Sequence, residues 1–120
     1  TIIRSRNPKN TICQEEVFGP VLTAMTFGSL TEAIELANDS EFGLSASIWS
    51  KNIDHCLTAS KKLKAGTVWI NTFMDGHPEL PFGGYKQSGS GRELGRLSVE
   101  EYTEIKTVQM HIGERKNMWV

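Results

Sequence analysis

The sequence has only two cysteines and no long apolar run, so several large classes of protein are excluded. Its two cysteines, Cys13 and Cys56, are far apart and form no Cys-x-x-Cys pair. Neither a disulfide framework nor a zinc site is therefore predicted, and a reducing cytoplasm is the expected location. No apolar stretch approaches the roughly 20 residues that a membrane-spanning helix needs.

An excess of charge is also missing. The chain of 120 residues has 13 basic and 14 acidic side chains and a net charge of -1. This balance predicts neither a nucleic-acid surface nor a membrane surface. The three histidines, His55, His77 and His111, are dispersed and predict no metal site. The first residues, from Thr1, contain no signal peptide, and we expect the chain to be an excised segment.

The apolar pattern predicts alternating strands and helices. Residues 21–27 are apolar on both faces, as in a buried strand. Residues 29–32 have the spacing of a capping box before an amphipathic helix, and residues 44–49 alternate as a second strand. Asn52 or Asp54 is then expected to cap a second helix, before a third strand at residues 67–71.

That second helix is expected to turn one apolar face inward and to end at a left-handed glycine. The expected inner face consists of Ile53, Cys56, Leu57 and Leu63, and Gly66 is the expected left-handed cap. Strand, helix, strand, helix, strand is the βαβ pattern, which predicts an α/β fold with a mainly parallel sheet.

The rest of the chain predicts a loop, a short helix and a closing strand. Residues 72–91 are rich in glycine and turn residues and are expected at the carboxyl edge of the sheet, where open α/β sheets bind ligands. A short helix is expected within residues 93–102. Residues 105–112 alternate as an edge strand whose backbone groups are available to another chain.

Three motifs in order carry a family resemblance. They are Glu15-Glu16-Val17-Phe18-Gly19-Pro20-Val21, Gly66-Thr67-Val68-Trp69-Ile70-Asn71 and Pro81-Phe82-Gly83-Gly84-Tyr85-Lys86-Gln87-Ser88-Gly89-Ser90-Gly91-Arg92-Glu93-Leu94-Gly95. Together they resemble the C-terminal part of NAD(P)-dependent aldehyde dehydrogenases, from about residue 12 to residue 108. The resemblance implies that residues 1–103 are part of the catalytic domain and residues 104–120 are an oligomerisation strand and tail.

The resemblance implies half of a cofactor site, for NAD or NADP. Glu16 matches the carboxylate that binds the nicotinamide-ribose hydroxyls, and Phe18 matches the aromatic residue that packs on that end of the cofactor. A carboxylate can accept from two vicinal hydroxyls, and a flat ring suits a flat nicotinamide. From the residues alone, without the resemblance, Glu16 is expected to be an exposed surface acid and Phe18 a core residue.

The resemblance also implies one wall of an aldehyde tunnel. Phe82 matches a residue that lines the substrate channel, although plain core packing also accounts for it. Met74 and Gly76 belong to the variable substrate loop, and Gly76 stands where aliphatic-aldehyde enzymes tend to have bulky aromatics. Asp75 and Glu79 make this loop acidic, which resembles betaine and amino-aldehyde dehydrogenases. Carboxylates at these positions would attract a cationic aldehyde.

The family's nucleophilic cysteine and its general base have no match here. The expected Gly-Gln-x-Cys and Glu-Leu-Gly-Gly motifs are absent, so the chain alone is expected to be inactive. Cys13 and Cys56 are predicted to be structural thiols. The expected partners are the aldehyde, the remainder of the parent chain and further copies in a homo-oligomer.

Three other interpretations deserve comparison. A non-enzymatic α/β interaction module would bury Phe82 fully. A semialdehyde dehydrogenase would want basic residues in the substrate loop, where His77 is the nearest candidate. A phosphate loop at Gly89–Gly95 is disfavoured, because the glycine spacing is wrong and no strand precedes it. Lys86 is predicted to be a surface charge.

Overall fold

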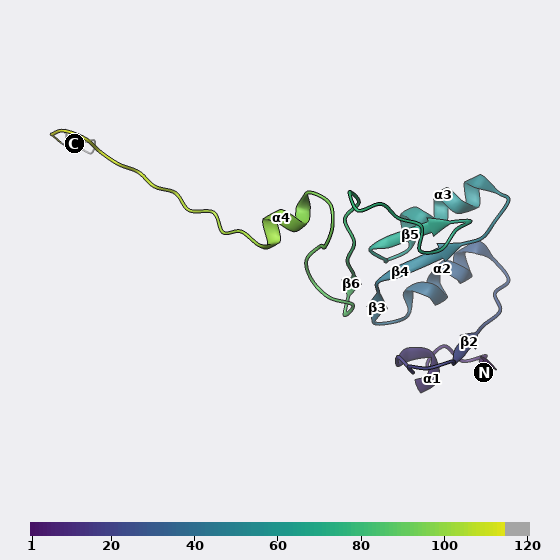
Figure 1. The fold of residues 1–120 in the computed structure, drawn as a ribbon. Helices are drawn as coiled ribbons and strands as arrows, with labels where there is room; N and C mark the ends of the chain where they lie inside the picture. Colours follow the sequence, from purple (N-terminus) through teal and green to yellow (C-terminus); the bar gives the residue numbers. More distant parts are fainter. Residues whose placement is uncertain (115–120) are drawn as a thin grey trace, which may run out of the picture.

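The computed structural model describes residues 1–114 as an α/β arrangement of short strands and two main helices (Figure 1). In chain order the elements are β1 (Ile2–Arg4), α1 (Thr11–Gln14), β2 (Leu22–Ala24), α2 (Leu30–Asn38), β3 (Phe42–Gly43), β4 (Ser45–Ile48), α3 (Ile53–Lys62), β5 (Thr67–Ile70), β6 (Tyr85–Lys86) and α4 (Leu97–Glu101). The expected α/β class, with parallel strand pairs, is confirmed.

The βαβ unit of β4, α3 and β5 forms as predicted. The two strands are parallel, with Ser45 opposite Thr67 and Ile48 opposite Ile70. Asn52, rather than Asp54, caps α3, because its Oδ1 accepts from the N–H groups of Asp54 and His55 at 2.9 and 3.2 Å. This cap satisfies two of the N–H groups that the first turn leaves without partners.

The predicted capping box begins α2. Ser29 Oγ accepts from the Glu32 N–H at 3.2 Å, and the Glu32 carboxylate accepts from the Gly28 N–H at 2.6 Å. Helix α2 contacts α3, and α3 contacts β4. The apolar side chains buried among residues 1–114 lie on these two helices: Ile34, Cys56 and Ala59.

The sheet differs from the prediction, because the strands form three separate pairs. Strand β2 pairs in parallel with β1, not with β4, and β3 pairs antiparallel with β6. The expectation that residues 21–27 form a buried strand is wrong, since only β2 forms there and Leu22 is exposed. The two-residue β6 escaped prediction because it is too short to carry a period.

Two details of α3 were also predicted wrongly. Ile53 and Leu57 are exposed, and Ala59 packs inward beside Cys56 in their place. Gly66 does not adopt a left-handed conformation; α3 ends at Lys62, and Leu63 caps it with extended backbone. Glycine is needed at Gly66 for a different reason, because a Cβ atom there would overlap the carbonyl oxygen of Gly83. The loop backbone thus lies directly against the start of β5.

The predicted closing strand does not pair with any strand among residues 1–114. Residues 105–112 are extended and exposed, and Figure 1 shows them leading away from the body of the protein. A strand needs a hydrogen-bonded neighbour, and the described residues provide none for this segment. The tail with Trp119 lies outside the described residues.

Much apolar surface stays in contact with solvent. The chain exposes 10393 Å², whereas a compact monomer of this length exposes about 6,500 Å². Within the part that the structure describes, the helices are all too short or too polar to cross a membrane.

Candidate functional site

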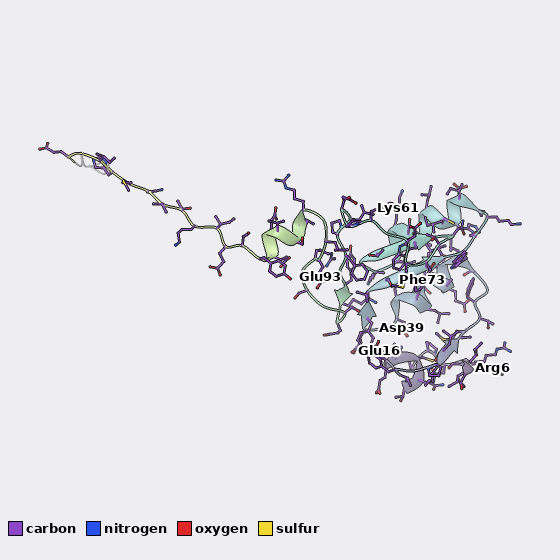
Figure 2. The ribbon with its side chains drawn as sticks, viewed as in Figure 1. Arg6, Glu16, Asp39, Lys61, Phe73 and Glu93 are labelled. Carbon is purple, nitrogen blue, oxygen red and sulfur yellow. The ribbon has the colours of Figure 1, made fainter. Side chains whose placement is uncertain are left out.

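The Glu16 cleft lies between the N-terminal segment and the body of the protein. It has a volume of 630 Å³. Glu16 itself is exposed and is labelled in Figure 2. The lining residues are Cys13, Gln14, Glu15, Glu16, Ala37, Ser40, Phe42, Gly43, Leu44, Ser45, Gln87 and Ser88. Amide, hydroxyl and carboxylate groups predominate, which suits the hydroxyl-rich end of a nucleotide.

The Phe82 cleft lies on the glycine-rich loop, beside α4, and measures 430 Å³. Phe82 and Glu93 bind each other through both backbone groups at 2.7 Å, which closes the loop; Glu93 is labelled in Figure 2. Phe82 is half-buried, against the full burial that an interaction module predicts. An aromatic edge therefore lies beside an open cavity.

Arg92 stiffens this loop from inside. Its Nη1 donates to the carbonyls of Gly84 and Gly91 at 3.0 and 2.7 Å, and its guanidinium lies 5.5 Å from the centre of the Tyr85 ring. A cation over an aromatic face adds a modest attraction. Arg92 thus binds the loop's own backbone.

The two clefts meet. Leu44 and Ser88 line both of them, and Ser88 Oγ accepts from the Gly43 N–H at 2.9 Å. Motifs more than 60 residues apart, at Glu16 and Phe82, are therefore brought to adjoining cavities. No motif had pointed to Leu44, which the alternating pattern places simply within a strand.

Lys86 holds this junction to α2 and is more than a surface charge. Its ammonium donates to the carbonyls of Asn38 and Ser40 at 3.0 and 2.7 Å. Asn38 ends α2, where helix carbonyls lack partners and a cation complements the helix dipole. The earlier expectation missed this, because the contact joins residues 46 and 48 positions apart.

Three of the predicted site residues stand apart from these clefts. Phe18 is 86% exposed and lines neither cavity. Met74 and Gly76 are exposed on the loop that follows β5, and neither lines the Phe82 cleft. Glu16 and Phe82 thus line adjoining clefts, whereas the predicted substrate-loop residues Met74 and Gly76 line neither of them.

That substrate loop, residues 72–80, is anchored near its start. Ser47 Oγ donates to the Thr72 carbonyl at 2.6 Å, and Trp69 Nε1 donates to the Asp75 carbonyl at 2.6 Å. The rings of Trp69 and Phe73 meet edge to face, with centroids 5.4 Å apart. Sequence patterns offered no signal for the Ser47 contact.

Each cysteine donates its thiol hydrogen bond to a backbone carbonyl. Cys13 borders the Glu16 cleft and donates through Sγ to the Asn7 carbonyl at 3.6 Å. Cys56 is buried on α3, and its Sγ donates to the Ser50 carbonyl at 3.8 Å. Activation of a thiol needs a neighbouring cation or base, and neither contact provides one.

Comparison with known proteins assigns the chain to a family. The sequence profile described as "Aldehyde dehydrogenase family" matches residues 1–108. Betaine aldehyde dehydrogenase of Bacillus subtilis (strain 168) is 55% identical over 108 residues, which cover 90% of this chain and 22% of that protein.

Solved structures agree in fold. The NAD-dependent aldehyde dehydrogenase from Sinorhizobium meliloti matches with a TM-score of 0.87 and 46% identity, over 99% of this chain and 24% of that one. Betaine aldehyde dehydrogenase from Staphylococcus aureus in complex with NAD+ matches with a TM-score of 0.79 and 50% identity, over 84% of this chain and 20% of that one.

The chain spans about a quarter or less of the length of these three relatives. Its own match is nonetheless nearly complete, since residues 1–108 carry the family profile and fold as the same region does in the solved structures. The chain belongs to the aldehyde dehydrogenase family.

Proposed function

We propose that this chain is the C-terminal part of an aldehyde dehydrogenase that oxidises an aldehyde to a carboxylic acid with NAD(P)+. The observation that carries the proposal is the meeting of the Glu16 and Phe82 clefts at Leu44 and Ser88. An enzyme that moves a hydride must hold donor and acceptor side by side. Residues 1–103 would complete the catalytic domain, and residues 104–120 would serve oligomerisation.

Glu16 would hold the cofactor by its ribose. Its carboxylate is exposed at a cleft whose lining also includes amide and hydroxyl groups, and its two oxygens can accept from vicinal hydroxyls. Phe18, exposed two residues later, would pack against the nicotinamide end once the rest of the enzyme is present. The bound NAD(P)+ would supply the hydride acceptor.

Phe82 would line the aldehyde channel, and the substrate loop with Met74 and Gly76 would form its mouth. Asp75 and Glu79 place two carboxylates on this exposed loop, which favours cationic aldehydes such as betaine or amino aldehydes. The resemblance to betaine aldehyde dehydrogenases supports this choice. The loop has no lysine or arginine, which disfavours a semialdehyde substrate with its own carboxylate.

The nucleophile would come from the remainder of the parent chain. In the family's reaction a thiolate adds to the aldehyde carbonyl, the adduct loses a hydride to NAD(P)+, and water hydrolyses the resulting thioester to the acid. Cys13 and Cys56 lie in contacts that do not activate a thiol. The isolated chain is therefore expected to be inactive.

The test uses the full-length protein with its upstream residues, and follows reduction of NAD(P)+ by absorbance. Replacing Glu16 by Gln removes the charge but keeps the shape, and should raise the KM for the cofactor about tenfold. Glu15→Gln, in the same cleft, is the matched control and should leave this KM within about twofold. Equal values for both variants would refute the assignment of Glu16.

Phe82 is tested through the other substrate. Phe82→Ala should raise the KM for the aldehyde and leave the cofactor KM unchanged, because Phe82 lines the second cleft and not the Glu16 cleft. Asp75→Asn with Glu79→Gln should weaken binding of betaine aldehyde more than that of an uncharged aldehyde of similar size. A wild-type protein that oxidises no aldehyde would overturn the whole proposal.

A further inference from the structure

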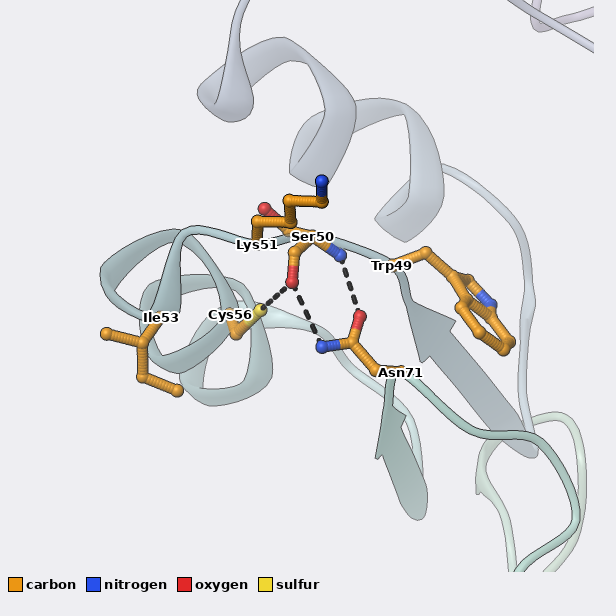
Figure 3. A pocket seen from close by; sticks show the side chains of 6 residues that line it. All are labelled: Trp49, Ser50, Lys51, Ile53, Cys56 and Asn71. Carbon is orange, nitrogen blue, oxygen red and sulfur yellow. Dashed lines mark hydrogen bonds between the residues drawn. The ribbon is translucent and has the colours of Figure 1, made fainter.

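A third pocket, apart from the two clefts, lies where β4 and β5 end, and Asn71 lines one side of it (Figure 3). The Asn71 side chain binds both backbone groups of Ser50. Its Oδ1 accepts from the Ser50 N–H at 2.9 Å, and its Nδ2 donates to the Ser50 carbonyl at 3.0 Å. One amide thus replaces a backbone pair and continues the parallel ladder of β4 and β5 beyond both strands.

Ser50 joins three elements at this point. Its carbonyl also accepts from Cys56 Sγ on α3 at 3.8 Å, as Figure 3 shows. Its Oγ accepts from the N–H of Asn52, the residue that caps α3, at 3.1 Å. Ser50, which follows β4, is therefore hydrogen-bonded both to the start of α3 and, through Asn71, to the end of β5.

Asn71 is also the residue at which the chain turns into the substrate loop. Its φ is 55°, a left-handed conformation that asparagine tolerates better than most residues. Its own N–H donates to the Ile48 carbonyl at 2.8 Å. The next residue, Thr72, is held by Ser47 Oγ, so the loop leaves the sheet from a point fixed on both sides.

The loop beyond this point presents Met74 outward. Met74 has a φ of 55° and an exposed side chain. The carbonyl of Asp75 is tied back to Trp69 Nε1 on β5. Between the two tethers, the position of Met74 depends on the direction in which Asn71 starts the loop.

We propose that Asn71 is a positioning residue for the aldehyde: its side-chain amide fixes the start of the substrate loop and thereby sets where Met74 and Gly76 stand. This inference rests on the proposed role of that loop. Asn71 does not line the Glu16 cleft, so its effect is confined to the aldehyde. Loss of the amide frees the loop at its root without touching the cofactor site.

Asn38 offers a matched control. Its amide makes the same kind of pair elsewhere, with Nδ2 donating to the Lys62 carbonyl at 2.9 Å and Oδ1 accepting from the Lys64 N–H at 2.8 Å. This pair joins α2 to the connection between α3 and β5, away from the substrate loop. Asn38→Gly and Asn71→Gly therefore lose equal numbers of hydrogen bonds, and glycine adopts the left-handed backbone of Asn71 without strain.

The decisive experiment is steady-state kinetics on the full-length enzyme. Asn71→Gly should raise the aldehyde KM about tenfold, since a small misplacement at a reaction site is costly. Its cofactor KM should stay within about twofold of wild type. Asn38→Gly should lower the thermal midpoint comparably and leave the aldehyde KM unchanged. An unchanged aldehyde KM in Asn71→Gly, or the same rise in Asn38→Gly, would overturn the proposal.

Backbone hydrogen exchange separates this inference from the proposed function. In the ligand-free full-length protein, residues 72–76 should exchange faster in Asn71→Gly than in wild type or Asn38→Gly. Asn71→Asp keeps the acceptor for the Ser50 N–H but loses the donor, so an intermediate rate is expected. If wild type oxidises no aldehyde, the proposed function fails, and equal exchange in all variants would refute the role of Asn71 independently.

Discussion

Two segments of this chain have similar alternating sequences and opposite fates. Residues 44–49 become β4, which pairs with β5 and packs under α3. Residues 105–112 alternate equally well, yet they stay extended and solvated, and Ile105 is fully exposed at 101%. Alternation therefore specifies a strand only where the same chain also supplies a neighbouring strand and a cover for its apolar face.

Overfilling the β4–α3–β5 unit should have the largest effect. A methyl group at Gly66 would overlap the Gly83 carbonyl oxygen, which belongs to the backbone and has little room to move. We expect Gly66→Ala to lower the free energy of unfolding by about 3 kcal/mol, measured by urea denaturation. Strands β4 and β5 would then lose part of their packing and become more like the solvent-exposed residues 105–112.

The same substitution at Gly76 is the control. No atom lies within contact distance of a Cβ at Gly76, and its backbone is not left-handed. Gly76→Ala should be neutral or slightly stabilising, by up to about 1 kcal/mol. Equal losses for the two variants would mean that close approach of the loop to β5 is not what Gly66 provides.

Residues 105–112 should form a strand when a second strand is available to pair with them. We predict that this segment pairs with another copy of the chain, as the proposed oligomer requires. A charge within that interface, Val108→Glu, should then weaken association by about 2 kcal/mol or more, measured by sedimentation. Thr107→Glu, on the opposite face of the alternation, should have a smaller effect, and identical results for the pair would count against a β-paired interface.

The local parts of the fold were predictable because their causes are local. Both helices carry their signals within four residues, at Ser29 with Glu32 and at Asn52, and both form as expected. The chain's strand partners were not predictable in the same way. Strand β2 pairs with β1, where no strand was predicted, because three residues are too few to carry a side-chain period.

The candidate site divides along the same line. Glu16 and Phe82 came from a motif resemblance, but nothing in the sequence indicated that Leu44 and Ser88 would join their clefts. The Asn71 clamp was also invisible, since its partner Ser50 lies 21 positions away in an unremarkable turn. Contacts between residues far apart in the sequence can be identified only once the fold is known.

Removing the cap of α3 should have an intermediate effect, because it weakens the cover of β4 without overfilling it. Asn52→Ala leaves the N–H groups of Asp54 and His55 without their acceptor. A loss of about 1 kcal/mol is expected, again by urea denaturation. Asn52→Asp should restore nearly all of it, because a carboxylate accepts the same bonds and complements the helix dipole. No recovery with Asp would mean that loss of the two cap hydrogen bonds is not the cause of the destabilisation.

The smallest effect should come from the exposed ion pair between Lys9 and Asp39, although its geometry is good. Lys9 Nζ lies 2.6 Å from Asp39 Oδ1 and links the N-terminal segment to the end of α2. Water screens the pair, since the Lys9 side chain is largely exposed, and ordering a long side chain costs entropy. Lys9→Ala should therefore change the free energy of unfolding by no more than about 0.5 kcal/mol. A double-mutant cycle with Asp39→Asn isolates the pair, and its coupling should fall further in high salt. A coupling energy larger than the loss in Asn52→Ala would show that an ion pair holds the N-terminal segment to the body of the protein. The chain would then contain a third kind of segment, held by charge rather than packed or left unpartnered.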